Sequence, residues 1–133
     1  MAVILDTGVI ISGERGSFDL ERWIQSQPGE KFEVAAITVA ELWHGVERAT
    51  APHRTKRRLY IETVLAPLEI VPYTEETARE HARLWAKLEL SGRMIGDYDL
   101  IIAATALERG NAVATFNTRH FTAIDGLEVI EPK

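Results

Sequence analysis

Four short segments place polar residues beside apolar runs. Asp6 directly follows the run "VIL", Glu41 lies in "ITVAELWHG", and Asp97 and Asp99 precede "LIIAATAL". Asn117 comes shortly after the run "AVAT". Carboxylate and amide oxygens suit a hard cation such as Mg²⁺ or Mn²⁺. Such an ion can activate water and stabilise the charge on a phosphodiester, so these residue types favour phosphoester hydrolysis.

Each of these residues also has an ordinary structural explanation. Asp6 could cap a helix that begins near Gly8. The sequence "TVAE" at residues 38–41 matches a capping box, in which the Glu side chain returns to the backbone of the cap. Acidic residues in a first helical turn are favoured by the helix dipole, which accounts for one Asp better than for two. We expect Asp97 to be that cap and Asp99 to point along the sheet edge.

Short apolar runs predict the strands that position these residues. Runs at residues 3–5, 34–37, 68–71 and 112–115 are typical of parallel strands covered on both faces, and residues 127–130 predict a last, edge strand. The segments between them have helical spacing, clearest over residues 77–90, where one stripe holds Ala78, Ala82, Trp85 and Leu88, with His81 beside it. This alternation favours an α/β layered domain with a parallel sheet and right-handed helical crossovers.

The predicted topology brings four of the polar residues to one edge of the sheet. Ligands of open parallel sheets bind outside the carboxyl ends of the strands, where Asp6, Glu41, Asp99 and Asn117 are expected. Clustered carboxylates repel one another and raise one another's pKa, so such a group is costly unless a cation neutralises it. The combination therefore predicts a magnesium or manganese site more strongly than any single residue does.

Length and charge restrict the remaining possibilities. The 133 residues are expected to form one domain, spanning 1–133, with a globular composition. The net charge of -5 has the wrong sign for a protein that binds nucleic acid over a broad surface, so any such contact should be local.

Several other kinds of site and location are not favoured. The chain has no cysteine, which removes disulfides and thiol chemistry and makes the cytoplasm the default expectation. We expect no signal peptide and no membrane insertion, because the apolar runs are too short. Phosphate-binding glycine loops and nucleophile elbows are absent from the sequence. The histidines lack the i,i+4 pairing of a zinc site; they are His44, His53, His81 and His120.

Four ordered motifs resemble the PIN-domain ribonucleases, specifically the VapC toxins of prokaryotic toxin–antitoxin pairs. They are "ILDTGVII", "ITVAELWHG", "IGDYDLIIAATAL" and "VATFNTRHFTAIDGLEVI", and together they cover nearly the whole chain at the family's length. The resemblance implies a three-layer α/β/α sandwich with a central, mainly parallel sheet. It also implies an acidic pocket that holds Mg²⁺ or Mn²⁺ and cleaves RNA.

The resemblance assigns roles position by position. Asp6, Glu41 and Asp99 match the three acids of the family, and Asn117 matches a fourth position that is often Asp but commonly Asn. Thr115 matches a hydroxyl that usually lies by the pocket. Two positions depart from the pattern, since Gly8 stands where Asn is most frequent and Asp97 is an additional acid. Asp97 could supplement or replace Asn117 as an outer ligand.

The resemblance further implies partners, namely a small VapB-like antitoxin that blocks the pocket and a second toxin subunit in a dimer, within a larger toxin–antitoxin complex. Trp23, Leu42, Trp43 and a helix over residues 52–65 could form a groove for an apolar partner helix, or these tryptophans could belong to the core. The basic run "HRTKRR" at residues 53–58 is either a solvated helix face or a phosphate or partner contact. Arg119 and His120 either meet an RNA phosphate or lie in solvent.

These observations lead to one first hypothesis and two rivals. The first is a metal-dependent endoribonuclease toxin whose RNA (transfer, ribosomal or messenger) the sequence does not identify. One rival is an aspartyl-phosphate phosphoryl-transfer domain with Asp6 as nucleophile, although one well-known version needs an acid where Gly8 stands. The other is a non-catalytic RNA- or protein-binding module of the same fold, against which the retained acids count.

Overall fold

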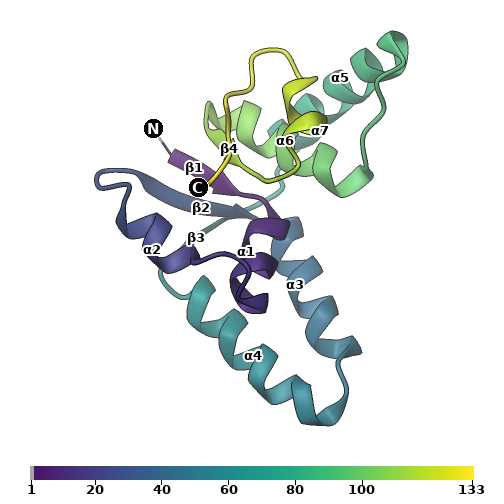
Figure 1. Ribbon diagram of the computed structural model, residues 1–133. Helices are drawn as coiled ribbons and strands as arrows, with labels where there is room; N and C mark the ends of the chain where they lie inside the picture. The colour runs from purple at the N-terminus through teal and green to yellow at the C-terminus, as the bar shows by residue number, and fades with distance from the viewer. Residues whose placement is uncertain (1) are drawn as a thin grey trace.

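A five-stranded parallel sheet forms the centre of the computed structural model, which describes residues 2–133 (Figure 1). The strand order is β3-β2-β1-β4-β5, and all four neighbouring pairs are parallel. The strands are β1 (Ala2–Leu5), β2 (Lys31–Ala35), β3 (Glu69–Val71), β4 (Ala112–Ala114) and β5 (Val129–Ile130). The five predicted strands and the edge position of the last one are therefore confirmed, but β2 spans Lys31–Ala35 rather than residues 34–37, and β5 begins at Val129 rather than at residue 127.

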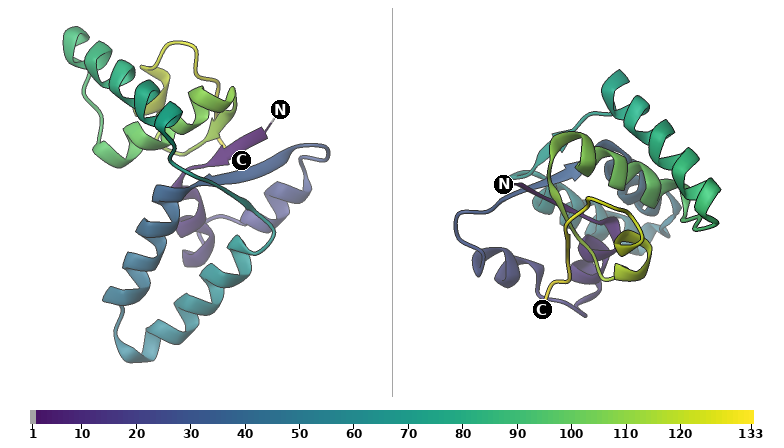
Figure 2. Two further views of the ribbon diagram at one scale, coloured as in Figure 1. Left: turned by 180° about the vertical axis from the view of Figure 1, so that it is seen from behind. Right: turned by 90° about the horizontal axis from the view of Figure 1, so that it is seen from above.

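Helices cover both faces of the sheet. One face carries α1 (Thr7–Arg15), α2 (Leu20–Gln25), α3 (Ala36–Arg48) and α4 (Ala51–Leu65), and the other carries α5 (Glu75–Ser91), α6 (Asp97–Arg109) and α7 (Thr118–Thr122) (Figure 2). Because successive strand residues point to opposite faces, Val3 and Leu5 belong to the first core and Ile4 to the second. The predicted three-layer architecture is confirmed. None of the helices within residues 2–133 is long and apolar enough to cross a membrane.

The first core packs a helical hairpin against the sheet. Helices α3 and α4 form this hairpin, which extends away from the strands, and Pro52 lies in the first turn of α4 as predicted. Trp23 and Leu42 are both buried in this core, and Trp43 is half-buried against it. The interpretation of Trp23 and Trp43 as core residues is therefore confirmed.

The buried face of α5 differs from the prediction by about one residue. Thr77, Leu84 and Leu88 are buried, whereas Ala82 is exposed and Trp85 is 47% exposed. Most of α5 is polar, so its buried stripe is narrow and contains a threonine that apolar spacing does not reveal. The predicted stripe through Ala82 and Trp85 is wrong.

Candidate active site

Asp6 lies where β1 passes into α1, at the carboxyl edge of the sheet. It occupies the N-cap position of α1, but its side chain makes no capping hydrogen bond and is almost completely buried. Leu5 is paired with Ala114, so the residues that follow these two, Asp6 and Thr115, lie next to each other. Thr115 Oγ1 donates a hydrogen bond of 2.7 Å to Asp6 Oδ2. A capping role therefore does not explain the Asp6 carboxylate.

Thr115 connects Asp6 to the loop that carries Asn117. The Thr115 side chain is fully buried, and its Oγ1 accepts a 2.9 Å hydrogen bond from the backbone N–H of Asn117. Asn117 is the N-cap residue of the short helix α7. The predicted place of Asn117, beyond the end of β4 and at the same edge as Asp6, is confirmed.

Glu41 lies in the second turn of α3 and not in its first. Because α3 begins at Ala36, Thr38 is inside the helix and cannot be its N-cap, so the predicted capping box is wrong. Glu41 Oε1 instead accepts a 2.7 Å hydrogen bond from Oγ1 of Thr7, the residue after Asp6. Thr7 Oγ1 also lies 3.0 Å from Thr38 Oγ1. The buried hydroxyls of Thr7 and Thr38 therefore link the start of α1 to α3, next to the Glu41 carboxylate.

Asp99 is brought to the same edge by the first turn of α6. Its Oδ2 lies 3.1 Å from His120 Nδ1 and 3.5 Å from Asn117 Nδ2, and the latter is at the limit of a hydrogen bond. Asp97 is an exposed residue of the same turn, and Gly96 rather than Asp97 is the N-cap. The expectation that Asp97 caps the helix is therefore wrong, and the contacts to α7 involve Asp99.

The three acids influence one another electrostatically. The pKa of Asp6 is raised from 3.8 to about 6, mainly by burial and in part by the charges of Asp99 and Glu41. The Thr115 hydroxyl and the Thr7 backbone amide act in the opposite direction. Burial also raises the pKa of Glu41, with a contribution from Asp99, while the Thr7 hydroxyl lowers it. The topology therefore brings Asp6, Glu41 and Asp99 within reach of one another's charge.

The donor set fits a hard divalent cation, whose charge would offset this repulsion. Each carboxylate contacts a different neighbour: Asp6 and Glu41 accept hydrogen bonds from Thr115 and Thr7, and Asp99 lies 3.1 Å from His120 Nδ1. Within residues 2–133, no three acidic or histidine side chains form a ready-made metal site as they stand.

Sequence reasoning missed two contributors to this site. Thr7 follows Asp6 in "ILDTG", and the adjacency of a hydroxyl to an acid was the signal that could have found it. The sequence predicts His120 either at an RNA phosphate or in solvent, but its Nδ1 lies 3.1 Å from Asp99 Oδ2 and 2.7 Å from Asn117 Nδ2. Only the position of α7 relative to α6 shows that contact.

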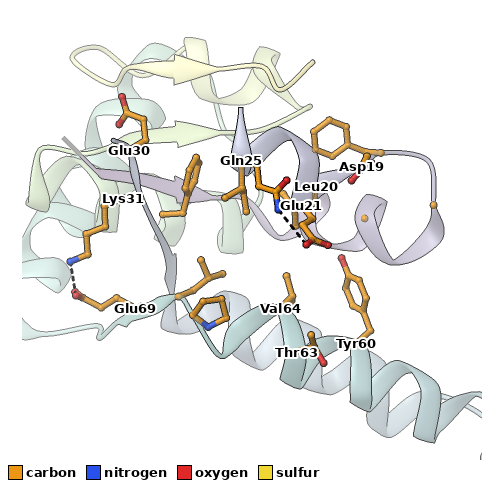
Figure 3. A pocket seen from close by; sticks show the side chains of 17 residues that line it. Asp19, Leu20, Glu21, Gln25, Glu30, Lys31, Tyr60, Thr63, Val64 and Glu69 are labelled. Carbon is orange, nitrogen blue, oxygen red and sulfur yellow. Dashed lines mark hydrogen bonds and ion pairs between the residues drawn. The ribbon is translucent and has the colours of Figure 1, made fainter. Parts of the chain in front are cut away.

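A separate hollow of about 960 Å³ lies between α2 and α4, and Asp6, Glu41 and Asp99 are not part of its lining. Figure 3 shows Leu20, Glu21 and Gln25 of α2 across it from Tyr60 and Val64 of α4. Its lining also includes Ile24 of α2 and apolar residues from the loops and strands, namely Phe18, Phe32 and Leu68. The predicted groove residues Trp23, Leu42 and Trp43 are not part of this lining, so only the contribution of α4 agrees with that prediction.

Comparison with known families relates this geometry to other proteins. The PIN domain profile matches residues 3–127. This chain belongs to the PIN domain family. Ribonuclease VapC1 of Rickettsia felis is 35% identical over 98% of this chain and 96% of its own length. The tRNA(fMet)-specific endonuclease VapC of Salmonella typhimurium is 33% identical over 72% of this chain and 71% of its own.

A solved structure agrees with these relatives. One chain of the DNA-bound VapBC complex of Salmonella typhimurium superposes with a TM-score of 0.86 at 27% identity, covering 97% of this chain and 96% of that one. The resemblance inferred from the four motifs is therefore confirmed, and this PIN domain is a member of the VapC ribonucleases.

Proposed function

We propose that this chain is the endoribonuclease toxin of a toxin–antitoxin pair and that it hydrolyses RNA with a divalent cation, Mg²⁺ or Mn²⁺. Asp6, Glu41 and Asp99 would hold the cation, and Asn117 would complete its coordination once its amide oxygen faces the ion. The observation that carries the proposal is the mutual charge effect among three acids from separate elements, in a chain of the VapC family. Bound there, the cation would polarise a water and the scissile phosphate.

The residues around the acids support this proposal by orienting them. Thr115 holds one oxygen of Asp6, leaving Oδ1 for another ligand. Thr7 holds Glu41, and His120 with Asn117 holds Asp99. The buried hydroxyls restrict the rotamers of two acids, which keeps the reorganisation needed on binding small. Asp97 lacks such contacts to α7, and we rank it behind Asn117 as an outer ligand.

Cleavage of total cellular RNA by the purified, partner-free protein tests the proposal. We expect discrete fragments with Mg²⁺ or Mn²⁺, and none with EDTA or with the Asp6→Asn variant. Asp97→Asn is the matched control, because it removes an acid from the neighbouring surface and should keep most of the activity. Mapping the fragment ends distinguishes tRNA from ribosomal and messenger RNA, and initiator tRNA is the first defined substrate to try, since one relative is named for it.

The same experiment has an outcome that contradicts the proposal. If the folded wild type leaves RNA intact under every metal condition, or if Asp6→Asn cuts equally well, the catalytic assignment is wrong. A binding module without catalysis would then be the better interpretation. Circular dichroism of both proteins establishes that they are folded before the comparison is made.

We further propose that an antitoxin segment binds the hollow between α2 and α4. Solved relatives are VapBC complexes, and apolar side chains such as Ile24 and Val64 line the hollow. Ile24→Glu should weaken protection when the chain is co-expressed with a cognate VapB-like antitoxin. Leu90→Glu on α5 is the control, because Leu90 is 90% exposed and lies elsewhere. Equal protection of both variants would contradict this placement.

A further inference from the structure

A second, smaller hollow lies between the end of α1 and the first half of α4. It measures about 240 Å³ and is lined by Glu14, Arg15, His53, Lys56, Arg57 and Tyr60. Three of these side chains are cationic and one is anionic, whereas the whole chain has a net charge of -5. Part of the basic run at residues 53–58 therefore lies next to Arg15 of α1 at this hollow.

The anionic member of the lining is already paired. Glu14 Oε2 accepts a 2.8 Å hydrogen bond from Arg57 Nε, and Arg57 Nη1 donates to the backbone carbonyl of Gly45 at 3.1 Å. In the part of the chain that the structure describes, no carboxylate lies within ion-pair distance of Arg15 or Lys56. Both of these side chains are exposed. The hollow therefore presents two available cations beside a fixed third.

One exposed helix face connects this hollow to the acids. Helix α1 begins directly after Asp6 and ends at Arg15, so the two are roughly 14 Å apart along the helix axis. Gly8 and Arg15 are seven residues apart and share the exposed face of α1. Gly8 has no side chain, and a Cβ atom at this position would meet only Asp6 Oδ2, at 4.0 Å. The surface next to Asp6 is therefore unobstructed at this point of α1.

We propose that the RNA strand leaves the acidic pocket along this face of α1 and that Arg15 and Lys56 bind one of its phosphates. This inference rests on the proposed ribonuclease function. At the stacking rise of about 3.4 Å per nucleotide, the distance corresponds to about four nucleotides from the scissile phosphate. Arginine binds phosphate oxygens in a bidentate manner and lysine acts as a point charge. Because the chain as a whole is negatively charged, the RNA strand is held by such a local contact.

Salt-dependent binding of RNA to the full chain tests the inference. The probe is fluorescein-labelled oligouridine of about 12 nucleotides, followed by anisotropy in the Asp6→Asn background with Mg²⁺, so that the RNA stays intact. Adding Arg15→Ala and Lys56→Ala should weaken binding about tenfold at low salt. The slope of log K against log salt should become shallower by about 0.7, since Arg15 and Lys56 contact one phosphate and each phosphate contact to a single strand contributes about 0.7.

The matched control removes two positive charges elsewhere. Arg83→Ala with Lys87→Ala changes the net charge equally, and these residues lie on α5, where they pair with Glu80 and Asp125. The control should leave affinity and slope unchanged.

A trinucleotide spans about 10 Å, too short to join the acids to the hollow, so its affinity should not differ between the Arg15 and Lys56 variant and its parent. Equal melting temperatures exclude a folding defect in the exposed variants.

The failure of this inference is distinguishable from the failure of the proposed function. If the wild type cuts RNA but the Arg15 and Lys56 variant keeps its affinity and salt slope, the strand follows another path and the inference is wrong. If the variant loses affinity for the antitoxin alone, the hollow is a protein contact and the inference is also wrong. If the wild type neither cuts nor binds RNA, both the function and the inference fail.

Discussion

Thr115 Oγ1 lies 2.7 Å from Asp6 Oδ2, although the two residues are 109 positions apart in the chain. The same hydroxyl accepts the backbone N–H of Asn117, so its only proton is directed to the Asp6 carboxylate. This bond stabilises the charged form of a buried acid and lowers its pKa against the effect of burial. The charge state of Asp6 therefore depends on the residue that directly follows β4.

Thr115→Val should remove this stabilisation at almost constant side-chain volume. We expect the pKa of Asp6 to rise above its value of about 6, because the hydroxyl is the largest of the contributions that lower it. We also expect kcat for RNA cleavage to fall about 10- to 100-fold, since loss of such a supporting contact typically costs that much. NMR titration of Asp6 in EDTA and steady-state cleavage kinetics measure the two effects.

Thr115→Ser is the control for this prediction, because it keeps a hydroxyl within reach of Asp6. It should retain a pKa and a kcat close to those of the wild type. A Val variant with an unchanged pKa would show that the hydroxyl does not support the carboxylate.

Asp6→Asn should stabilise the metal-free protein at neutral pH. The pKa of Asp6 is about 6 in the folded chain against 3.8 ordinarily, so folding favours the protonated form. The stability that the protonated Asp6 carboxyl contributes is fully present below pH 3.8 and is lost as the pH rises through 6. At pH 7 this loss amounts to about 2 to 3 kcal/mol of the free energy of unfolding. Asn does not titrate and should avoid most of this loss. Urea unfolding in EDTA at pH 7 and near pH 4 measures the difference.

The advantage of Asp6→Asn should disappear near pH 4, where the wild-type carboxyl is protonated. Glu41→Gln should act in the same direction with a smaller size, because Glu41 is only half-buried. An Asn variant that is less stable than the wild type at pH 7 would contradict the burial and repulsion assigned to Asp6.

Divalent cations should raise the melting temperature in the absence of RNA. A ligand that binds only the folded chain adds about 2.7 kcal/mol to stability at a concentration 100 times its dissociation constant. Asp6→Asn should abolish the shift, Asn117→Ala should reduce it, and Asp97→Asn should leave it nearly intact. Differential scanning fluorimetry with Mg²⁺ and Mn²⁺ measures it. If Asp97→Asn reduced the shift more than Asn117→Ala, Asp97 would be the outer ligand.

The strands and the edge at which Asp6, Glu41 and Asp99 meet could be predicted from the sequence. Apolar runs show where a covered parallel strand ends, and right-handed crossovers direct each strand end to the same side. The pairing of Leu5 with Ala114 then brings Asp6 next to Thr115, as the shared edge requires.

The contacts within the site could not be predicted, because they depend on where each helix starts and how it is rotated. The motif "TVAE" resembles a capping box, but α3 begins at Ala36, and this turns Glu41 toward Thr7. The contact of His120 with Asp99 depends on how α7 packs against α6, which local spacing does not determine. The error on α5 has the same origin, since a rotation by one residue exposes Trp85.

Glu33→Ala should cost about 1 to 3 kcal/mol of stability, because it removes the buried acceptor of hydrogen bonds from Asn111 and Arg109. Glu33 is fully buried on β2 and binds Asn111 Nδ2 at 2.7 Å, Arg109 Nη2 at 3.1 Å and Lys31 Nζ at 3.3 Å. Glu69→Ala is the control, since Glu69 contacts the same Arg109 and Lys31 from an exposed position and should cost much less. Urea unfolding at pH 7 compares the two, and equal losses would contradict the role of burial. Arg109 lies at the opposite end of α6 from Asp99, so the Glu33 variant should still cleave RNA below its melting temperature.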